Sequence, residues 1–306
     1  MTAYGTAAQR RGHAAPAARV GARAGGALAA SLFTLGLGLA VLALLGPLAT
    51  GVIEYRVTET LRNQTIGLDT VSLAVVAPLA VAAGLLVLRG HVAGQALGLG
   101  IGPYTAYMML QYVLGPEYRV FPGNNELLFP LCLALFTVGW VVSLTAWKTL
   151  GGELLPGSPR RDRLIGTVVL PILALVTFVR YVPALADAMS RSPEEAGYLA
   201  GPTFFWTIAL LDLGVLLPAT VAACIGLRRG APWSHRAMYL VAGWLGLIGP
   251  AVAGMGIVMY LNDDPAASGG GAVFMTALGL AFALLAVILY RPLFGSAARG
   301  EEKEGS

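Results

Sequence analysis

Long apolar runs separated by short polar stretches recur along the whole chain. Read over windows of about 19 residues, eight runs are long enough to cross roughly 30 Å of hydrocarbon as helices. They cover residues 27–50, 70–88, 95–114, 127–147, 164–186, 202–226, 237–260 and 271–290. This pattern predicts an all-α fold, a polytopic transmembrane helix bundle of about eight spans.

The segments outside the spans complete the predicted organisation. Residues 1–26 read as a basic, disordered cytoplasmic tail and residues 294–306 as a charged cytoplasmic tail, because neither can bury a core. Residues 27–293 form one membrane domain. The longest outer loop, about 51–69, is too short to hold a second domain.

Lys and Arg are concentrated in every second loop, so they gather on one side of the predicted membrane. Alternation places 15 of the 20 on one side, and ten of the 16 acidic residues in or beside the outer loops. The basic residues on the first side are Arg10, Arg11, Arg19, Arg23, Arg89, those of the Lys148–Arg163 loop, Arg228, Arg229, Arg236, Arg291, Arg299 and Lys303. Such an excess in short loops marks the cytoplasmic side, so both termini are predicted to be cytoplasmic.

The composition agrees with a membrane protein. The chain is 57% hydrophobic and 12% charged, against about 25% charged in soluble domains. Its net charge of +4 follows from the topology, so no nucleic-acid partner is expected. The partner predicted is the lipid bilayer of the cell membrane. Cys132 and Cys224 fall within spans and read as packing residues, which leaves no disulfide framework or metal site.

Two charged residues lie inside predicted spans, where each is expensive to bury. Asp212 lies eleven residues into the sixth span, and Arg180 lies seven residues from the outer end of the fifth. A short loop joins these spans, so they are expected to be antiparallel neighbours with both charges in the outer half. One interpretation is a paired site that lines a polar cavity. The other is a structural ion pair, or an Arg that reaches outward beside a protonated Asp.

The third span adds a polar stripe. Tyr104, Tyr107 and Gln111 follow at i, i+3 and i+7, which places them on one helix face. Tyr104 is too deep to be an interfacial tyrosine, and its hydroxyl needs a partner. The stripe is therefore a candidate part of the same site.

A short motif opens the second span and reads Gly-Leu-Asp-Thr-Val-Ser-Leu at 67–73. With the tyrosine-rich span that follows, residues 65–145 resemble a family of uncharacterised multi-pass prokaryotic membrane proteins with a Gly-x-Asp-x-Val-Ser/Thr-Leu motif here. The second position, often Gln in that family, is Leu68 in this chain. The resemblance implies no activity, but it singles out Asp69. Asp69 is expected either to cap the outer mouth of the helix or to belong to an outer-facing site.

The chain also contains a weak internal repeat. Residues 97–103 read Leu-Gly-Leu-Gly-Ile-Gly-Pro and residues 244–250 read Trp-Leu-Gly-Leu-Ile-Gly-Pro. Spans one to four and five to eight would then be parallel copies, an arrangement found in transporters. Chance recurrence is the alternative, since the chain has 40 Gly and 18 Pro.

These features favour a transporter or channel-like protein for a small solute or ion. The candidate site comprises Asp212, Arg180, Tyr104, Tyr107, Gln111 and Asp69. The competing class is a scaffold, partner subunit or signalling component whose polar groups only hold helices together. An intramembrane enzyme comes third, because no catalytic constellation occurs at one depth. No metal or cofactor is expected, and the sequence leaves the solute, coupling ion and oligomeric state open.

Overall fold

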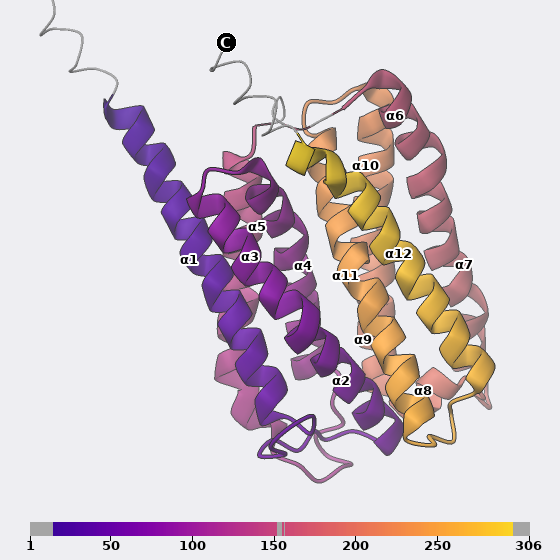
Figure 1. Ribbon diagram of the computed structural model, residues 1–306. Helices are drawn as coiled ribbons and strands as arrows, with labels where there is room; N and C mark the ends of the chain where they lie inside the picture. The colour runs from indigo at the N-terminus through magenta and orange to yellow at the C-terminus, as the bar shows by residue number, and fades with distance from the viewer. Residues whose placement is uncertain (1–14, 152–154, 156, 296–306) are drawn as a thin grey trace, which may run out of the picture.

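The computed structural model describes residues 15–151, 155 and 157–295, which form helices and loops without a strand (Figure 1). Several long helices are built from consecutive segments. The elements are α1 (Ala15–Leu45); α2, η1 and α3 (Glu59–Val71, Ser72–Val76, Ala77–Leu88); α4 (Val92–Leu114); η2 and α5 (Asn125–Leu128, Phe129–Thr149); α6, η4 and α7 (Pro159–Leu164, Ile165–Val169, Leu170–Ala188); α8 (Ala196–Ala200); α9, η5 and α10 (Pro202–Leu211, Asp212–Leu216, Leu217–Arg229); α11 (Ser234–Leu261); and α12 (Gly269–Gly295).

Among the described residues, seven helices are long and apolar enough to cross a membrane. The chain is therefore a multi-pass membrane protein, and the predicted all-α bundle is confirmed. The predicted span 95–114 coincides with α4, which is not among the seven. Its glycines, tyrosines and glutamines lower its hydropathy, and neighbouring helices bury most of its side chains. The total of eight spans stays a prediction.

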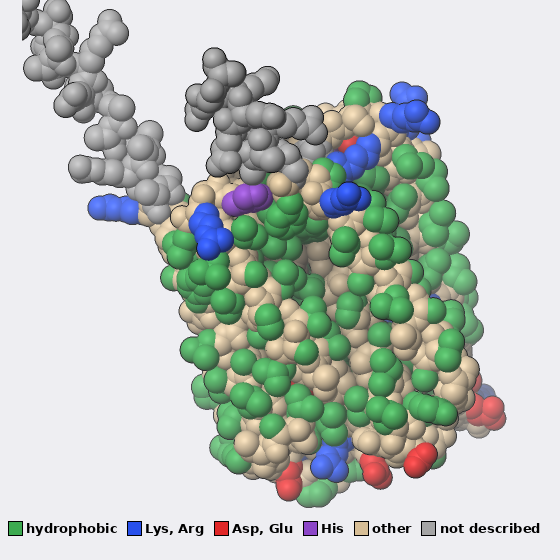
Figure 2. Space-filling view, viewed as in Figure 1, with side chains coloured by type: hydrophobic (Ala, Val, Ile, Leu, Met, Phe, Trp, Pro, Cys, Tyr) green, Lys and Arg blue, Asp and Glu red, His purple; other side chains and the backbone are tan. Residues whose placement is uncertain are grey.

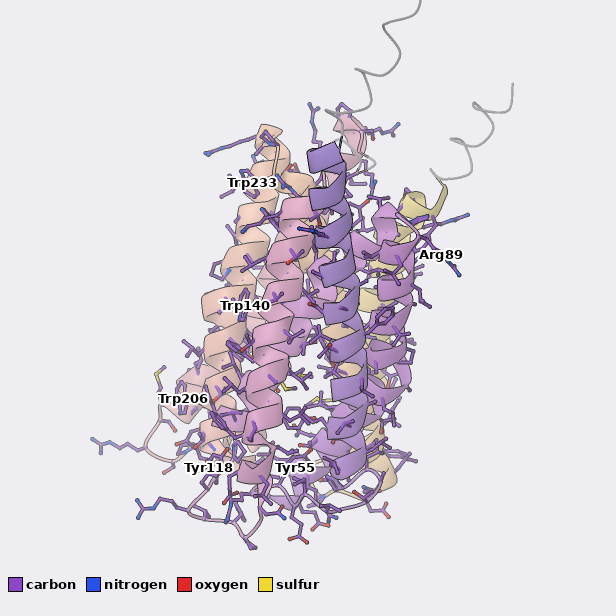
Figure 3. All side chains as sticks on the ribbon, turned by 90° about the vertical axis from the view of Figure 1, so that its left-hand side faces the viewer. Tyr55, Arg89, Tyr118, Trp140, Trp206 and Trp233 are labelled. Atoms are coloured by element: carbon purple, nitrogen blue, oxygen red, sulfur yellow. The ribbon has the colours of Figure 1, made fainter. Side chains whose placement is uncertain are left out.

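Charged side chains gather at the two ends of the bundle. Lys and Arg predominate at the end where α1 begins and α12 ends, acidic side chains gather at the other end, and hydrophobic side chains cover the middle (Figure 2). Trp233 lies near the Arg89 end and Trp206 nearer the end that carries Tyr55 and Tyr118 (Figure 3). This difference in charge between the two ends is the one that the sequence predicts. The side of the membrane on which the termini lie stays a prediction. The end opposite the termini is called the outer end below.

The second membrane helix starts much earlier than predicted. The sequence predicts a loop to residue 69 and a span from 70, but the helix begins at Glu59. Polar side chains in its first half are bonded within the protein: Asn63 Nδ2 donates to Asp264 at 2.8 Å, and Thr60 Oγ1 donates to it at 3.0 Å. A hydropathy window misses such a helix because its polarity is satisfied by residues distant in the sequence.

The two predicted tails fall largely outside the described residues. α1 begins at Ala15 within the predicted tail 1–26, and α12 ends at Gly295 within the predicted tail 294–306. The remaining residues of both tails, 1–14 and 296–306, are outside the part that the structure describes.

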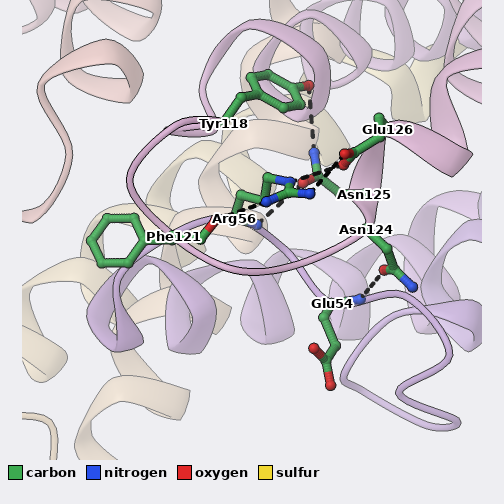
Figure 4. A network of polar contacts seen from close by, with 7 residues as sticks. All are labelled: Glu54, Arg56, Tyr118, Phe121, Asn124, Asn125 and Glu126. Carbon is green, nitrogen blue, oxygen red and sulfur yellow. Dashed lines mark hydrogen bonds and ion pairs between the residues drawn. The ribbon is translucent and has the colours of Figure 1, made fainter.

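The outer loops of the first half are tied together by polar contacts (Figure 4). Arg56 holds Glu126 through two hydrogen bonds, Nη2 to Oε1 at 2.8 Å and Nε to Oε2 at 3.0 Å. Its third bond runs from Nη1 to the Phe121 carbonyl at 3.0 Å. The Glu54 amide donates to Asn124 Oδ1 at 2.7 Å. These contacts fix the loop before α2 against the loop before α5.

The helices form two groups. Figure 1 shows α1–α5 on one side and α6–α12 on the other, with α11 packed against both α2 and α4. Glycines allow this close approach: a Cβ added at Gly67 would lie 2.5 Å from the Gly254 backbone, and one added at Gly100 would lie 2.6 Å from Gly243 Cα. Small residues at such crossings are how membrane helices pack closely.

Candidate functional site

Asp212 lies at the centre of a buried hydrogen-bonded cluster. It is 8% exposed and is the first residue of η5. Tyr107 of α4 donates to Oδ1 at 2.8 Å, and Tyr181 of α7 donates to Oδ2 at 2.7 Å. Arg180 Nη2 lies 3.5 Å from Oδ2. Two helices, α4 and α7, thus supply donors to a carboxylate carried by a third.

The guanidinium of Arg180 is positioned by Tyr181. Nη2 donates to the Tyr181 hydroxyl at 2.9 Å, and the guanidinium carbon lies 4.8 Å from the centre of the Tyr181 ring. The Arg180 side chain is 56% exposed, whereas that of Asp212 is 11% exposed. The anion of this pair is therefore enclosed by protein, while the cation stays open at the edge of the cluster.

Asp212 begins a π-helical turn in the middle of its membrane helix. In η1, η4 and η5 the amide after the turn bonds five residues back: Ala77 to Ser72, Leu170 to Ile165 and Leu217 to Asp212. A proline follows directly in each case, at 78, 171 and 218. Proline lacks an N–H and its ring crowds the preceding turn, so that turn widens. Such turns are frequent at functional sites.

A cavity of about 400 Å³ opens beside the Asp212 cluster in the outer half of the bundle. Its polar wall includes Tyr107, Gln111, Arg180, Tyr181 and Asp212. This volume lies within the range of sites for small molecules, roughly 300–1,000 Å³. The cavity thus has space for a ligand next to a charge pair.

The rest of the cavity wall is mainly apolar and rich in methionine. Met108 comes from α4, Met255 and Met259 from α11, and Met275 from α12. Phe205 of α9 adds an aromatic surface. A ligand in this cavity would therefore contact both a charged pair and a large apolar surface.

A second buried carboxylate, Asp69, has its own pair of tyrosines. It is 0% exposed and accepts hydrogen bonds from Tyr112 at Oδ1 and from Tyr55 at Oδ2, the latter at 3.3 Å. Burial, and after it Asp69, raises the pKa of Tyr55 above its ordinary value. The Tyr55 hydroxyl therefore stays protonated and able to donate.

The capping role predicted for Asp69 is wrong. The helix starts at Glu59, and its N-cap is Thr58, whose hydroxyl accepts from the Leu61 amide at 3.3 Å. Asp69 instead follows ten residues later, inside the helix. Its environment is set by tyrosines from other elements rather than by free amides of its own.

The structure brings four of the six predicted residues together: Asp212, Arg180, Tyr107 and Gln111 all line the large cavity. Tyr104 and Asp69 are not among its lining residues. Tyr104 is fully buried, and its hydroxyl lies 3.4 Å from Ser72 Oγ.

Three tyrosines in these clusters were not sequence candidates. Tyr181 directly follows Arg180 in the sequence. A hydroxyl next to a charge inside a span could have been predicted as its hydrogen-bond partner. Tyr112 lies next to Gln111 on α4 and turns toward α2. Tyr55 lies in a loop, where helical periodicity gives no information about its partner.

The chain was compared with protein-family models, curated proteins and solved structures. None of the three matches it. The likeness to a family over residues 65–145 therefore stays a prediction, and function is argued from the site alone.

The charge pair allows two kinds of recognition. Arg180 Nη2 lies 3.5 Å from Asp212 Oδ2, farther than the Tyr181 hydroxyl that donates to the same oxygen. A cationic group in the cavity can therefore approach Oδ2 in place of Arg180. An anionic group can pair with the exposed guanidinium instead. Both Asp212 oxygens keep a phenol donor in either case.

Proposed function

We propose that this membrane protein transports a small amphiphilic solute with a charged group, bound at Asp212 and Arg180. The carrying observation is that this intramembrane charge pair lines a 400 Å³ cavity rather than a closed helix interface. Intramembrane ionisable residues that face a cavity commonly mark a solute or ion path. The apolar wall suits the uncharged part of such a solute.

A smaller cavity of about 60 Å³ supports a path past the pair. Arg180 and Asp212 line this cavity as well as the large one. Its other lining residues include Val176, Leu216 and Leu245, each displaced along its helix toward the end that carries the termini. The charge pair therefore lies between two spaces, as expected of a site reached alternately from either side.

Recurrence between the two halves of the bundle also supports a transporter. Asp69 and Asp212 each lie ten residues after the start of a helix that then contains a π-turn and a proline. The Gly-Pro helices repeat a contact too: a Cβ at Gly102 would lie 2.5 Å from the Gly139 carbonyl, and one at Gly249 would lie 2.9 Å from that of Gly279. Parallel repeats of this kind occur in transporter folds.

A scaffold function accounts for fewer of these features. A scaffold needs its polar groups only to satisfy one another, and Tyr107, Tyr181 and Asp212 do so. It requires neither a cavity next to the pair nor a guanidinium that is half-exposed. Transport requires both a space and a charge that can change partners.

The test is solute uptake by liposomes that contain the full-length protein. The panel consists of labelled amphiphilic cations, anions and zwitterions of matched size. Uptake above empty liposomes is expected, with at least a tenfold loss in Asp212→Asn and Arg180→Gln. Tyr118→Phe, which changes an outer-loop tyrosine away from the cavity, is the matched control. Absence of uptake across the panel by folded protein would contradict transport.

Thiol accessibility tests the cavity independently. In a background with Cys132 and Cys224 replaced by Ala, Gln111→Cys and Tyr107→Cys should react with a membrane-impermeant thiol reagent added outside. Tyr104→Cys should not react, because Tyr104 is buried against Ser72. A solute that is transported should protect positions 107 and 111. Equal reactivity at all three positions would argue against the cavity.

A further inference from the structure

Asp69 is buried without a cation. Among the described residues, no Lys, Arg or His forms an ion pair with it, whereas Asp212 has Arg180. Its oxygens accept from Tyr112 and Tyr55. An ionised carboxylate away from water and without a counter-charge is expensive, and proteins relieve that cost by protonating the group or by donating hydrogen bonds to it.

Among the residues that the structure describes, the groups found around Asp69 are titratable but carry no fixed charge. Tyr55 comes from the loop before α2, Tyr112 and Tyr104 from α4, and Cys132 from α5. From the end of α1 the neighbour is Gly46, where an added Cβ would lie 3.1 Å from Asp69 Oδ2. Phenols, a thiol and a glycine leave the charge of Asp69 uncompensated.

The Asp69 cluster can satisfy both protonation states. When Asp69 is ionised, both phenols donate to it, as in the structure. When it is neutral, its O–H can donate to the Tyr55 oxygen, because a tyrosine hydroxyl both donates and accepts. The 3.3 Å contact then reverses, and the Tyr55 hydroxyl proton turns toward the small cavity that Tyr55 lines.

A small cavity beside this cluster shares lining residues with the large cavity. Tyr55, Tyr112 and Gln111 line a small cavity of about 20 Å³. That is room for about one water molecule, which needs at least ~10–15 Å³ by this measure. Gln111, Leu68 and Phe204 line both this cavity and the 400 Å³ cavity, and Gln111 is the polar member of this shared wall. A phenol and a water in the small cavity would relay a proton from Asp69 to this shared wall.

A metal ion fits this cluster less well than a proton. The two phenols bond Asp69 directly, so they occupy the positions that a cation would take. Within the described ranges, no group of three or more His, Cys, Asp or Glu residues could hold a metal ion.

We infer that Asp69 is a proton-binding site, separate from the Asp212 cluster, that exchanges its proton with the large cavity through its phenol partners, Tyr55 and Tyr112, and water in the small cavity that Gln111 borders. No bond other than O–H bonds changes: the proton leaves the Asp69 carboxyl and passes to water. The idea that this proton is the coupling ion of transport rests on the proposed function. The assignment of Asp69 as a proton-binding site does not depend on it.

The experiment is pH-difference infrared spectroscopy of the full-length protein in nanodiscs, with aspartate carbon-13 labelled at the carboxyl. The unsubstituted protein should show an aspartic acid C=O band that titrates and shifts in deuterated buffer. Asp69→Asn should lose this band, and Asp212→Asn should keep it. The inference is overturned if no titrating band is lost in Asp69→Asn while being kept in Asp212→Asn, because bands from the other aspartates should be present in both variants.

Two further variants keep the test decisive if Asp69→Asn does not fold. Tyr112→Phe and Tyr55→Phe retain the carboxyl but remove one hydrogen bond each, so they should shift the band to higher frequency. Tyr118→Phe should leave it unchanged, and equal spectra for all three would also refute the site. Uptake is measured on the same protein preparations reconstituted into liposomes. A proton band without uptake would reject the proposed function alone, and uptake without the band would reject the proton site alone.

Discussion

Tyr107 and Tyr112, five residues apart on α4, each donate a hydrogen bond to a different buried aspartate. At about 1.5 Å per residue, their positions differ by roughly 7.5 Å along the helix axis. One helix therefore connects the Asp212 cluster with the Asp69 cluster, and Gln111 between them faces both cavities. A movement of α4 would change both clusters together.

The coupling between Asp212 and Arg180 should be modest. Asp212→Asn is expected to destabilise by about 1–3 kcal/mol, because buried hydrogen bonds lose a charged acceptor. The pair itself should contribute only ~0.5–1 kcal/mol, since the Arg180 side chain is 56% exposed. A double-mutant cycle with Arg180→Gln, followed by thermal unfolding in detergent, measures this coupling. Strictly additive losses would show that the two charges do not interact.

Removing one phenol from the Asp212 cluster should have a clear effect on stability. Tyr107→Phe takes away the donor to Oδ1 at 2.8 Å and leaves a buried acceptor, at an expected cost of about 1–3 kcal/mol. Tyr118→Phe is the control. Its hydroxyl donates to the Val113 carbonyl at an exposed site and accepts only a long bond, 3.4 Å, from Asn125 Nδ2, so the effect should stay within about 0.5 kcal/mol. Denaturation midpoints of the two variants give the comparison. Equal midpoints would speak against a tightly held carboxylate.

The crossing of α2 and α11 should not tolerate a methyl group. Gly67→Ala would place a Cβ 2.5 Å from the Gly254 backbone, so the helices must separate, at about 1–3 kcal/mol. Gly26→Ala has open space within 4 Å and should change stability by no more than about 1 kcal/mol. Thermal unfolding of both variants in the same detergent is the measurement. A neutral Gly67→Ala would mean that this contact is looser than described.

The predicted orientation can be tested by labelling exposed loop positions. In the background without Cys132 and Cys224, Val120→Cys and Arg191→Cys should react with an impermeant reagent on intact cells. Arg229→Cys should react only after permeabilisation, because the predicted cytoplasmic loops carry the basic residues. Labelling of position 229 on intact cells would invert the topology.

The bundle was predictable because span length and loop charge are local properties of the sequence. The site was only partly so. Periodicity places Tyr104, Tyr107 and Gln111 on one face, yet α4 has different neighbours on the two edges of that face. Tyr104 meets Ser72, while Tyr107 meets Asp212. Which neighbour a side chain contacts is set by the tertiary arrangement.

Asp69 illustrates a second limit. Its helix could not be extended back to Glu59 from hydropathy, because Thr60 and Asn63 are bonded to Asp264, about 200 positions later in the chain. Tyr55, which bonds Asp69, lies in a loop without periodicity. Both contacts depend on how distant segments meet, which hydropathy and helical periodicity do not reveal.

The methionines that line the large cavity bear on selectivity. Met108, Met255, Met259 and Met275 are unbranched thioethers that can change rotamer at little cost. A cavity wall made of methionines can adapt its shape, so it does not require one particular solute shape. Under the proposed transport function, discrimination would fall to the placement of the solute's charge against Asp212 and Arg180. The protein should accept a graded series of hydrophobic ions that differ in shape, ranked by charge position more than by bulk.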